Sequence, residues 1–131
     1  MLYRAGLDET QAKRAIHPIG EDERVLKGAE LLEKGDLDGF GALMFDSHES
    51  SRNWFENSCE ELDTIVDASK EIPEVLGARL SGGGFGGSCC LLVKPEAADA
   101  IAAQIQAKYK AKHGDEPTCA VIKPSEGAHL V

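Results

Sequence analysis

The residue types that could carry chemistry in this chain gather in one glycine-rich segment, Gly82–Gly87, here called the glycine loop. Five of its six residues are glycine, and Phe85 is the exception. Ordering a glycine costs more backbone entropy than ordering any other residue, so five together require a physical reason. Either the backbone adopts positive φ at several positions, or another body approaches the main chain more closely than a Cβ permits. Successive N–H groups in such a loop can bind an anion such as phosphate, and we expect Phe85 to anchor the loop to the core.

The sequence context excludes several other kinds of glycine loop. The run contains G-x-G-x-x-G, but the following residues, Ser88–Val93, are typical of a strand, whereas a dinucleotide-binding loop opens a helix. The chain has neither the G-x-x-x-x-G-K-[ST] run of a P-loop nor the HRD and DFG segments of a protein kinase. A flexible hairpin turn without a ligand stays open as an alternative, although a two-residue turn needs only one or two glycines.

Outside the glycine loop, few side chains are spaced for catalysis. His48 could relay a proton, but it lies on an apolar stripe, where a histidine is usually a hydrogen-bonded core residue. Arg79 could reach a phosphate or remain in solvent. We expect Asp46 and Asp63 to cap or pair locally rather than to bind Mg²⁺, since neither has a carboxylate partner at ligand spacing. The acidic residues 21–23 are interpreted as a solvated helix face. The sequence therefore predicts no metal site and assigns no catalytic side chain.

Composition limits the class of protein. Hydrophobic residues make up 42% and charged residues 28% of the 131, as in a folded globular domain. Fourteen basic and 23 acidic residues give a net charge of −9, which disfavours nucleic acid and anionic lipid as partners. No apolar stretch is long enough to span a bilayer, and the N-terminus lacks the apolar run of a secretory signal, so we expect a cytoplasmic protein. The cysteines lack CxxC spacing and are expected to be reduced thiols: Cys59, Cys89, Cys90 and Cys119.

The first half of the chain carries helical signals. Each of three predicted helices begins at a capping residue, namely Asp8 (in capping-box spacing with Gln11), Asp36, and Ser58 (in capping-box spacing with Glu61). Gly35 and Pro73 are predicted to end the first and the third helix.

The second half carries strand signals on both sides of the glycine loop. The predicted strands are Leu76–Ser81 and Ser88–Lys94. A helix is predicted from Pro95 until Gly114, and Thr118–Lys123 is predicted to form another strand. This order predicts an α+β fold with a small antiparallel or mixed sheet and helices packed on one face.

Three stretches together resemble one enzyme family. The segment Leu76–Gly87 resembles the third signature motif of the galactokinase branch of the GHMP small-molecule kinases, including its Phe-Gly-Gly ending after a glycine triplet. Residues 47–52 and 57–63 are similar to the stretch around that branch's Ser-x-x-Glu-Leu-Asp segment, and Arg14–His17 with Glu21 is similar to one of its helices. The branch commonly has other residues at a few positions: Ala at Gly83, Thr at Ser81, Cys at Ser88 and Asp–Tyr at Trp54–Phe55.

The resemblance implies a fold, a reaction and a set of partners. Residues 1–131 would form a single GHMP kinase C-terminal domain of ferredoxin-like arrangement, with the N-terminal kinase half absent from this chain. The reaction would be transfer of the ATP γ-phosphoryl group to the anomeric hydroxyl of galactose. ATP and Mg²⁺ would be bound mainly by the missing N-terminal half, which would be the partner of this domain. Alone, the domain would be inactive and open to self-association through its exposed interdomain surface.

The resemblance also implies where the site lies. It places seven residues beside the phosphate and the sugar: Ser81, Gly82, Gly83, Gly84, Phe85, Gly86 and Gly87. Among them, Gly82, Gly84 and Gly86 are the expected backbone contributors. Two alternatives stay open, a non-catalytic galactokinase-like sensor or binding module and a GHMP kinase for another sugar.

Overall fold

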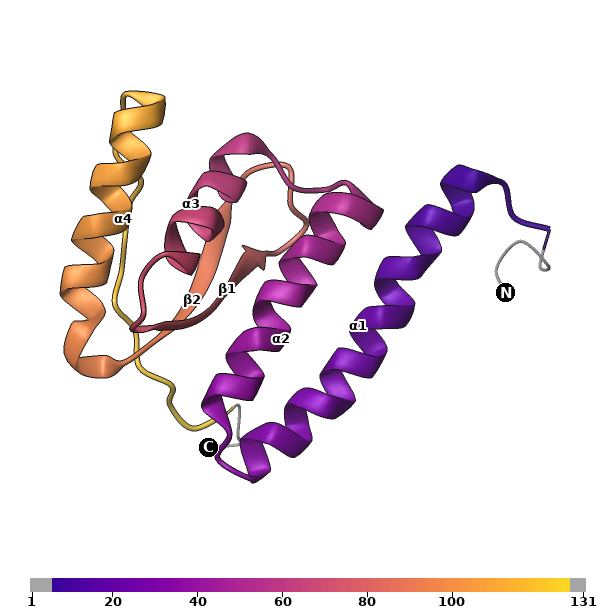
Figure 1. Cartoon of the computed structure of the whole chain (residues 1–131), viewed down its shortest axis with the longest axis horizontal. Helices are drawn as coiled ribbons and strands as arrows, with labels where there is room; N and C mark the ends of the chain where they lie inside the picture. Colours follow the sequence, from indigo (N-terminus) through magenta and orange to yellow (C-terminus); the bar gives the residue numbers. More distant parts are fainter. Residues whose placement is uncertain (1–5, 128–131) are drawn as a thin grey trace.

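The computed structural model describes residues 6–127 and is rich in helix (Figure 1). In chain order its elements are α1 (Glu9–Glu33), α2 (Leu37–Ser50), the π-helical turn η2 (Ser51–Phe55), α3 (Glu60–Lys70), β1 (Val75–Ser81), β2 (Ser88–Val93), the 3₁₀ turn η3 (Pro95–Ala97) and α4 (Ala98–His113). The predicted α+β plan with a small antiparallel sheet is confirmed. No helix within residues 6–127 has the length and apolar character needed to cross a membrane.

Capping residues start the first two helices as predicted. The Asp8 carboxylate accepts a hydrogen bond from the N–H of Gln11 at 2.8 Å, and the Gln11 side chain accepts one from the N–H of Asp8 at 3.1 Å. These two bonds complete the capping box of α1. At the start of α2, Asp36 accepts a bond from the N–H of Gly39 at 2.9 Å. Gly35 lies between the two helices with φ of +70°, a conformation that glycine adopts without strain.

The capping box predicted at the start of α3 is wrong. The residue at the N-cap is Cys59, whose side chain makes no capping bond. The hydroxyl of Ser58 donates instead to Oδ1 of Asp63 at 2.5 Å. The acidic first turn of α3 still complements the positive end of the helix dipole.

The sheet is a hairpin whose strands run antiparallel from the pair Ser81–Ser88, beside the glycine loop, to the pair Val75–Val93. Side chains of α3 and α4 pack against it and make the core, which consists of Ala68, Ile72, Val75, Ile101 and Ile105, with Phe45, Ile65, Leu91, Val93 and Ala97 partly buried around it. Each fully buried aliphatic side chain contributes about 1.5–3 kcal/mol relative to exposure. This core holds the hairpin, and therefore the base of the glycine loop, against two helices.

Helix α2 closes the edge of β1 that does not face β2 (Figure 1). The N–H of Leu80 donates to Nδ1 of His48 on α2 at 3.2 Å. Further along, α2 and β1 meet main chain to main chain: a Cβ on Gly41 would collide with the carbonyl of Leu76, and one on Gly77 would collide with the backbone of Gly41. The helix thus covers polar groups that an open sheet edge would leave unpaired.

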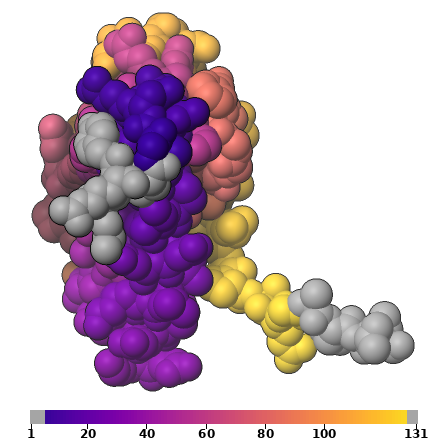
Figure 2. Space-filling model, turned by 90° about the vertical axis from the view of Figure 1, so that its right-hand side faces the viewer, coloured from indigo at the N-terminus to yellow at the C-terminus, as the bar shows by residue number. Residues whose placement is uncertain are grey.

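The C-terminal segment differs from the sequence-based expectation. Residues 118–123 form no strand, and the chain after Gly114 has no regular structure up to residue 127. The left-handed conformation of Gly114, with φ of +90°, ends α4 as predicted. Val121 and Ile122 are exposed, Ile122 to 82%, so the alternating pattern finds no buried face to define a register. Figure 2 shows the yellow end of the described chain leaving the body of the molecule.

Because α2 and β1 meet backbone to backbone, we expect one added methyl group at this contact to destabilise the folded protein. Gly41→Ala should lower the free energy of unfolding by about 1–3 kcal/mol, because the new Cβ overpacks a backbone contact that cannot yield as a side chain does. Urea unfolding followed by circular dichroism measures the effect. Gly20→Ala in α1 is the matched control, since its Cβ would meet only the flexible end of Arg24. Equal stability of Gly41→Ala and wild type would contradict the close approach.

Candidate functional site

Most glycines of the glycine loop adopt positive φ. The values are +79° for Gly82, +81° for Gly84, +124° for Gly86 and +88° for Gly87. Phe85 is also left-handed, with φ of +58°. Residues with a Cβ rarely adopt such angles, so the first of the two expected reasons for the glycines is confirmed.

The second expected reason, close approach of another body, holds at Gly84. A Cβ on Gly84 would collide with the backbone carbonyl of Asn57. That carbonyl accepts a hydrogen bond from the N–H of Phe85 at 2.6 Å. The side-chain amide of Asn57 donates to the carbonyl of Gly83 at 3.0 Å. One residue outside the loop therefore binds the main chain on both sides of Gly84.

The other side of the glycine loop is open. At Gly82, Gly83, Gly86 and Gly87, a Cβ would meet no atom within 4 Å. The Phe85 side chain is 77% exposed, so the expectation that it anchors the loop to the core is wrong. The loop is held instead by its backbone, through Asn57. This leaves a stretch of main chain, bare of side chains except at Phe85, that a ligand or another protein region can approach closely.

His48 is a buried structural residue rather than a proton relay. It is fully buried, and its Nδ1 accepts the N–H of Leu80, so Nε2 carries the proton and donates to Oδ1 of Asp63 at 3.0 Å. Burial and the nearby Arg52 guanidinium lower the pKa of His48, even though Asp63 acts to raise it. The neutral ring joins α2, α3 and β1, as its place on the apolar stripe predicted.

Asp63 is the common partner of three polar side chains around and including His48. Its Oδ1 receives Ser58 at 2.5 Å and His48 at 3.0 Å, and it lies 3.0 Å from Nε of Arg52 in an ion pair. Burial acts to raise the pKa of Asp63, but the Ser58 hydroxyl and the Arg52 guanidinium hold it below its ordinary value. The predicted local pairing is thus confirmed for Asp63. The side chain of Asp46 is exposed and has no hydrogen bond or ion pair within residues 6–127, so the prediction is wrong for that residue.

Arg79 is bound within the protein rather than free for phosphate. Its guanidinium lies 3.5 Å from the carboxylate of Glu21, which also pairs with Arg24 at 2.6 Å and accepts the hydroxyl of Ser47 at 2.9 Å. Burial acts to raise the pKa of Glu21, but Arg24 and Ser47 hold it below its ordinary value. The interpretation of Glu21 as part of a solvated face is therefore wrong, because it ties α1 to α2 and β1.

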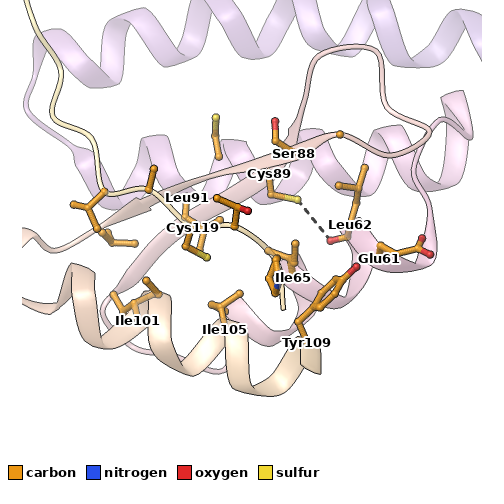
Figure 3. Close-up of a pocket in the computed structure, with 18 of the residues that line it drawn as sticks. Glu61, Leu62, Ile65, Ser88, Cys89, Leu91, Ile101, Ile105, Tyr109 and Cys119 are labelled. Carbon is orange, nitrogen blue, oxygen red and sulfur yellow. Dashed lines mark hydrogen bonds between the residues drawn. The ribbon is translucent and has the colours of Figure 1, made fainter. Parts of the chain in front are cut away.

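An apolar groove of about 900 Å³ runs from the glycine loop along β2 (Figure 3). Its walls include Leu62, Ile65, Ile101 and Ile105, and residues 117–122 cross it. All four cysteines line it as free thiols. Burial raises the pKa of one of them, Cys89, to about 12, and its thiol donates to the carbonyl of Leu62 at 3.7 Å, so it is no nucleophile. These apolar walls do not suit phosphate, so we take the glycine loop, at one end of the groove, as the candidate site.

Metal ligands do not gather in the described part of the chain. Within residues 6–127, no group of three or more His, Cys, Asp or Glu side chains could hold a metal ion. The loop residues expected to form the site, from Ser81 to Gly87, do lie together as one turn at the end of the hairpin.

Sequence reasoning missed the residues that support the glycine loop. In the sequence, Asn57 stands out only as part of the stretch 57–63 that is similar to the family. Nothing in its local pattern predicts a contact 26 positions away. Glu56 was missed as well: it is left-handed, with φ of +58°, and pairs with Lys13 and with Arg14. A non-glycine residue in this conformation cannot be recognised from its type, so no signal was available.

Comparisons with known proteins agree on one family. Residues 29–111 match the family described as "GHMP kinases C terminal". The chain is 42% identical over 125 residues to the galactokinase of Thermotoga petrophila, and 40% identical over 124 residues to that of Clostridium beijerinckii. These matches cover 95% of this chain but only 36% and 32% of the two relatives, so the chain spans about a third of their length.

Solved structures show the same relation. The crystal structure of Lactococcus lactis galactokinase complexed with galactose matches with a TM-score of 0.80 and 34% identity, covering 83% of this chain and 28% of that one. The L. major mevalonate kinase in complex with R-mevalonate matches with a TM-score of 0.60 and 38% identity, covering 66% of this chain and 26% of that one.

Fold, loop and family match together define the class: the chain belongs to the GHMP kinases, in the family of their C-terminal domains. Within that class, the similarity is to the C-terminal domain of a galactokinase, as the sequence resemblance indicated.

The His48 network predicts how stability depends on pH. The folded state keeps the ring neutral because burial lowers the pKa of His48, whereas in the unfolded chain this histidine takes up a proton below its ordinary pKa of 6.5. The unfolded state then binds more protons, so stability should fall as the pH drops below 6.5. Urea unfolding at pH 7.5 and 5.5 measures this.

His48→Gln separates the network from other titrating groups. At pH 7.5 it should be less stable than wild type by about 1–3 kcal/mol, since Leu80 loses its buried acceptor. Its loss of stability between pH 7.5 and 5.5 should be smaller than that of wild type. An equal loss in the two proteins would show that His48 does not carry the pH dependence.

Proposed function

We propose that this chain is the C-terminal part of a galactokinase, which transfers the γ-phosphoryl group of ATP to the anomeric hydroxyl of galactose. The observation that carries the proposal is the glycine loop, held in one conformation from one side and open on the other. Membership of the GHMP kinases and the galactokinase relatives at 40–42% identity support this reaction class.

The glycine loop suits phosphoryl transfer because that reaction depends mainly on positioning and on stabilising charge. A main chain without side chains lets a phosphate group and its acceptor approach within hydrogen-bonding distance of backbone N–H groups. We place Ser81–Gly87 beside the nucleotide phosphates and the sugar, with Gly82, Gly84 and Gly86 as the backbone contributors. The open space at Gly82 and Gly86 supports this placement.

Neither His48 nor Asp63 is free to act as a general base for the acceptor hydroxyl. His48 is fully buried with both ring nitrogens bonded, and Asp63 is held by three donor groups. The described residues also do not fit a Mg²⁺ site, because no sufficient group of ligands gathers among them. We therefore assign the base, the metal and most of the ATP contacts to an N-terminal partner region, and we assign no step of the reaction through Mg²⁺ to this domain.

The division between two regions predicts that the 131-residue chain alone shows no galactose phosphorylation above background. Replacing the matched 125 residues of Thermotoga petrophila galactokinase with this chain should give an active chimera, since the two are 42% identical there. Formation of galactose 1-phosphate from labelled ATP measures both. Turnover by the chain alone would contradict the division, and an inactive but folded chimera would favour a non-catalytic sensor. A chimera that prefers another sugar would favour the other alternative, a GHMP kinase for that sugar.

The role of the glycine loop predicts a large effect of one substitution. Gly84→Val in the chimera should lower kcat by more than about tenfold, or ~1.4 kcal/mol, because it displaces the loop from Asn57 and from its left-handed backbone. Gly20→Ala, in α1 and outside the glycine loop, is the matched control: its Cβ would meet only the flexible end of Arg24, so its kcat should stay within about threefold of the parent. Unchanged turnover in a correctly folded Gly84→Val chimera would reject the role.

A further inference from the structure

We propose that Asn57 is a positioning residue, which holds the glycine loop in the conformation that receives the transferring phosphoryl group. This inference rests on the function proposed above and names the side chain on which the geometry of the loop depends. Asn57 does not belong to the loop in sequence: it lies 26 positions before Gly83, in the turn between η2 and α3.

Asn57 binds the glycine loop at the residues immediately before and after Gly84. Its side-chain amide donates to the carbonyl of Gly83 at 3.0 Å, and its backbone carbonyl accepts the N–H of Phe85 at 2.6 Å. Gly84 lies between these two bonds and packs against the same carbonyl. Three successive loop residues are therefore fixed by one partner that is only 5% exposed.

Asn57 is itself held from both sides. Before it, Glu56 is left-handed and pairs with Arg14 at 2.5 Å and with Lys13, both on α1. After it, Ser58 donates to Asp63 on α3. The N–H of Asn57 bonds back to the carbonyl of Ser51 at 3.3 Å. A residue whose backbone and neighbours are bonded to other elements can restrain a loop that would otherwise sample many conformations.

The side-chain bond should be removable without unfolding the protein. The Oδ1 atom of Asn57 is buried and has no hydrogen-bond partner within residues 6–127, so an apolar side chain would leave no new buried donor behind. Gly83 is exposed, and its carbonyl can bond to water when the amide is gone. Asn57→Val therefore removes one restraint on the loop and keeps the bond between the Asn57 carbonyl and Phe85.

Amide hydrogen exchange of the 131-residue chain, measured by NMR, tests the hold on the loop. In Asn57→Val, exchange at Phe85, whose N–H bonds to the Asn57 carbonyl, should accelerate by more than about tenfold, while the amides of the core strands keep their rates. Asn57→Asp, which keeps the shape but as a carboxylate cannot donate, should accelerate exchange at the same Phe85 amide. Asn53→Ala is the matched control, since the side chain of this exposed asparagine bonds, among residues 6–127, only to Glu49. Unchanged loop amides in both Asn57 variants would overturn the inference.

Kinetics of the chimera tests the consequence for the reaction. Asn57→Val should lower kcat by about tenfold with the KM for galactose within about twofold, the pattern of an interaction that matters in the transition state. Loosened amides with unchanged kcat, while Gly84→Val lowers kcat, would overturn the positioning role. Loosened amides with unchanged kcat in both Asn57→Val and Gly84→Val would instead overturn the role of the loop in the proposed function.

Discussion

Contact of main chain with main chain is the constraint on which this domain depends. It occurs twice along β1 and its extension: at Gly41 and Gly77, where α2 meets the strand, and at Gly84, where the glycine loop meets Asn57. In both places a single methyl group would force the backbones apart. The first contact fixes the strand that carries the loop, and the second fixes the loop itself. Because interiors are close-packed, a shift at the first contact would be transmitted to the second.

Between these two contacts, a polar network fixes how the helices meet the strand. His48 binds the N–H of Leu80, which a covered sheet edge would otherwise leave without a partner. Its second nitrogen donates to Asp63, which also forms an ion pair with Arg52 and accepts a hydrogen bond from Ser58. Such a network stabilises the fold only while its groups stay paired. Leaving one buried polar group unpaired destabilises the protein by more than a typical hydrogen bond stabilises it. The network therefore favours one arrangement of α2, α3 and β1. Its bond to β1 is made at Leu80, two residues before the glycine loop begins.

Short sequence patterns correctly predicted the structural features that depend on neighbouring residues. The caps at Asp8 and Asp36 and the two strands beside the glycine loop follow from patterns a few residues long. The predictions failed where a distant partner decides the outcome. Phe85 is exposed because the loop is held through its backbone, and residues 118–123 form no strand because no face buries them. Glycine content indicated that a constraint exists, but its source, Asn57, could be found only in three dimensions.

If the domain binds phosphate as proposed, its charge distribution favours contact through the main chain rather than through side chains. The chain carries a net charge of −9, so its average field repels a nucleotide. Within residues 6–127, each arginine is paired with a carboxylate: Arg14 with Glu56, Arg24 and Arg79 with Glu21, and Arg52 with Asp63. Freeing Arg52 would take away the cation that pairs with Asp63, a partly buried carboxylate, which is costly. Backbone N–H groups carry no such cost. A loop of glycines therefore lets an acidic domain approach a phosphate without giving up the ion pairs that hold its helices together.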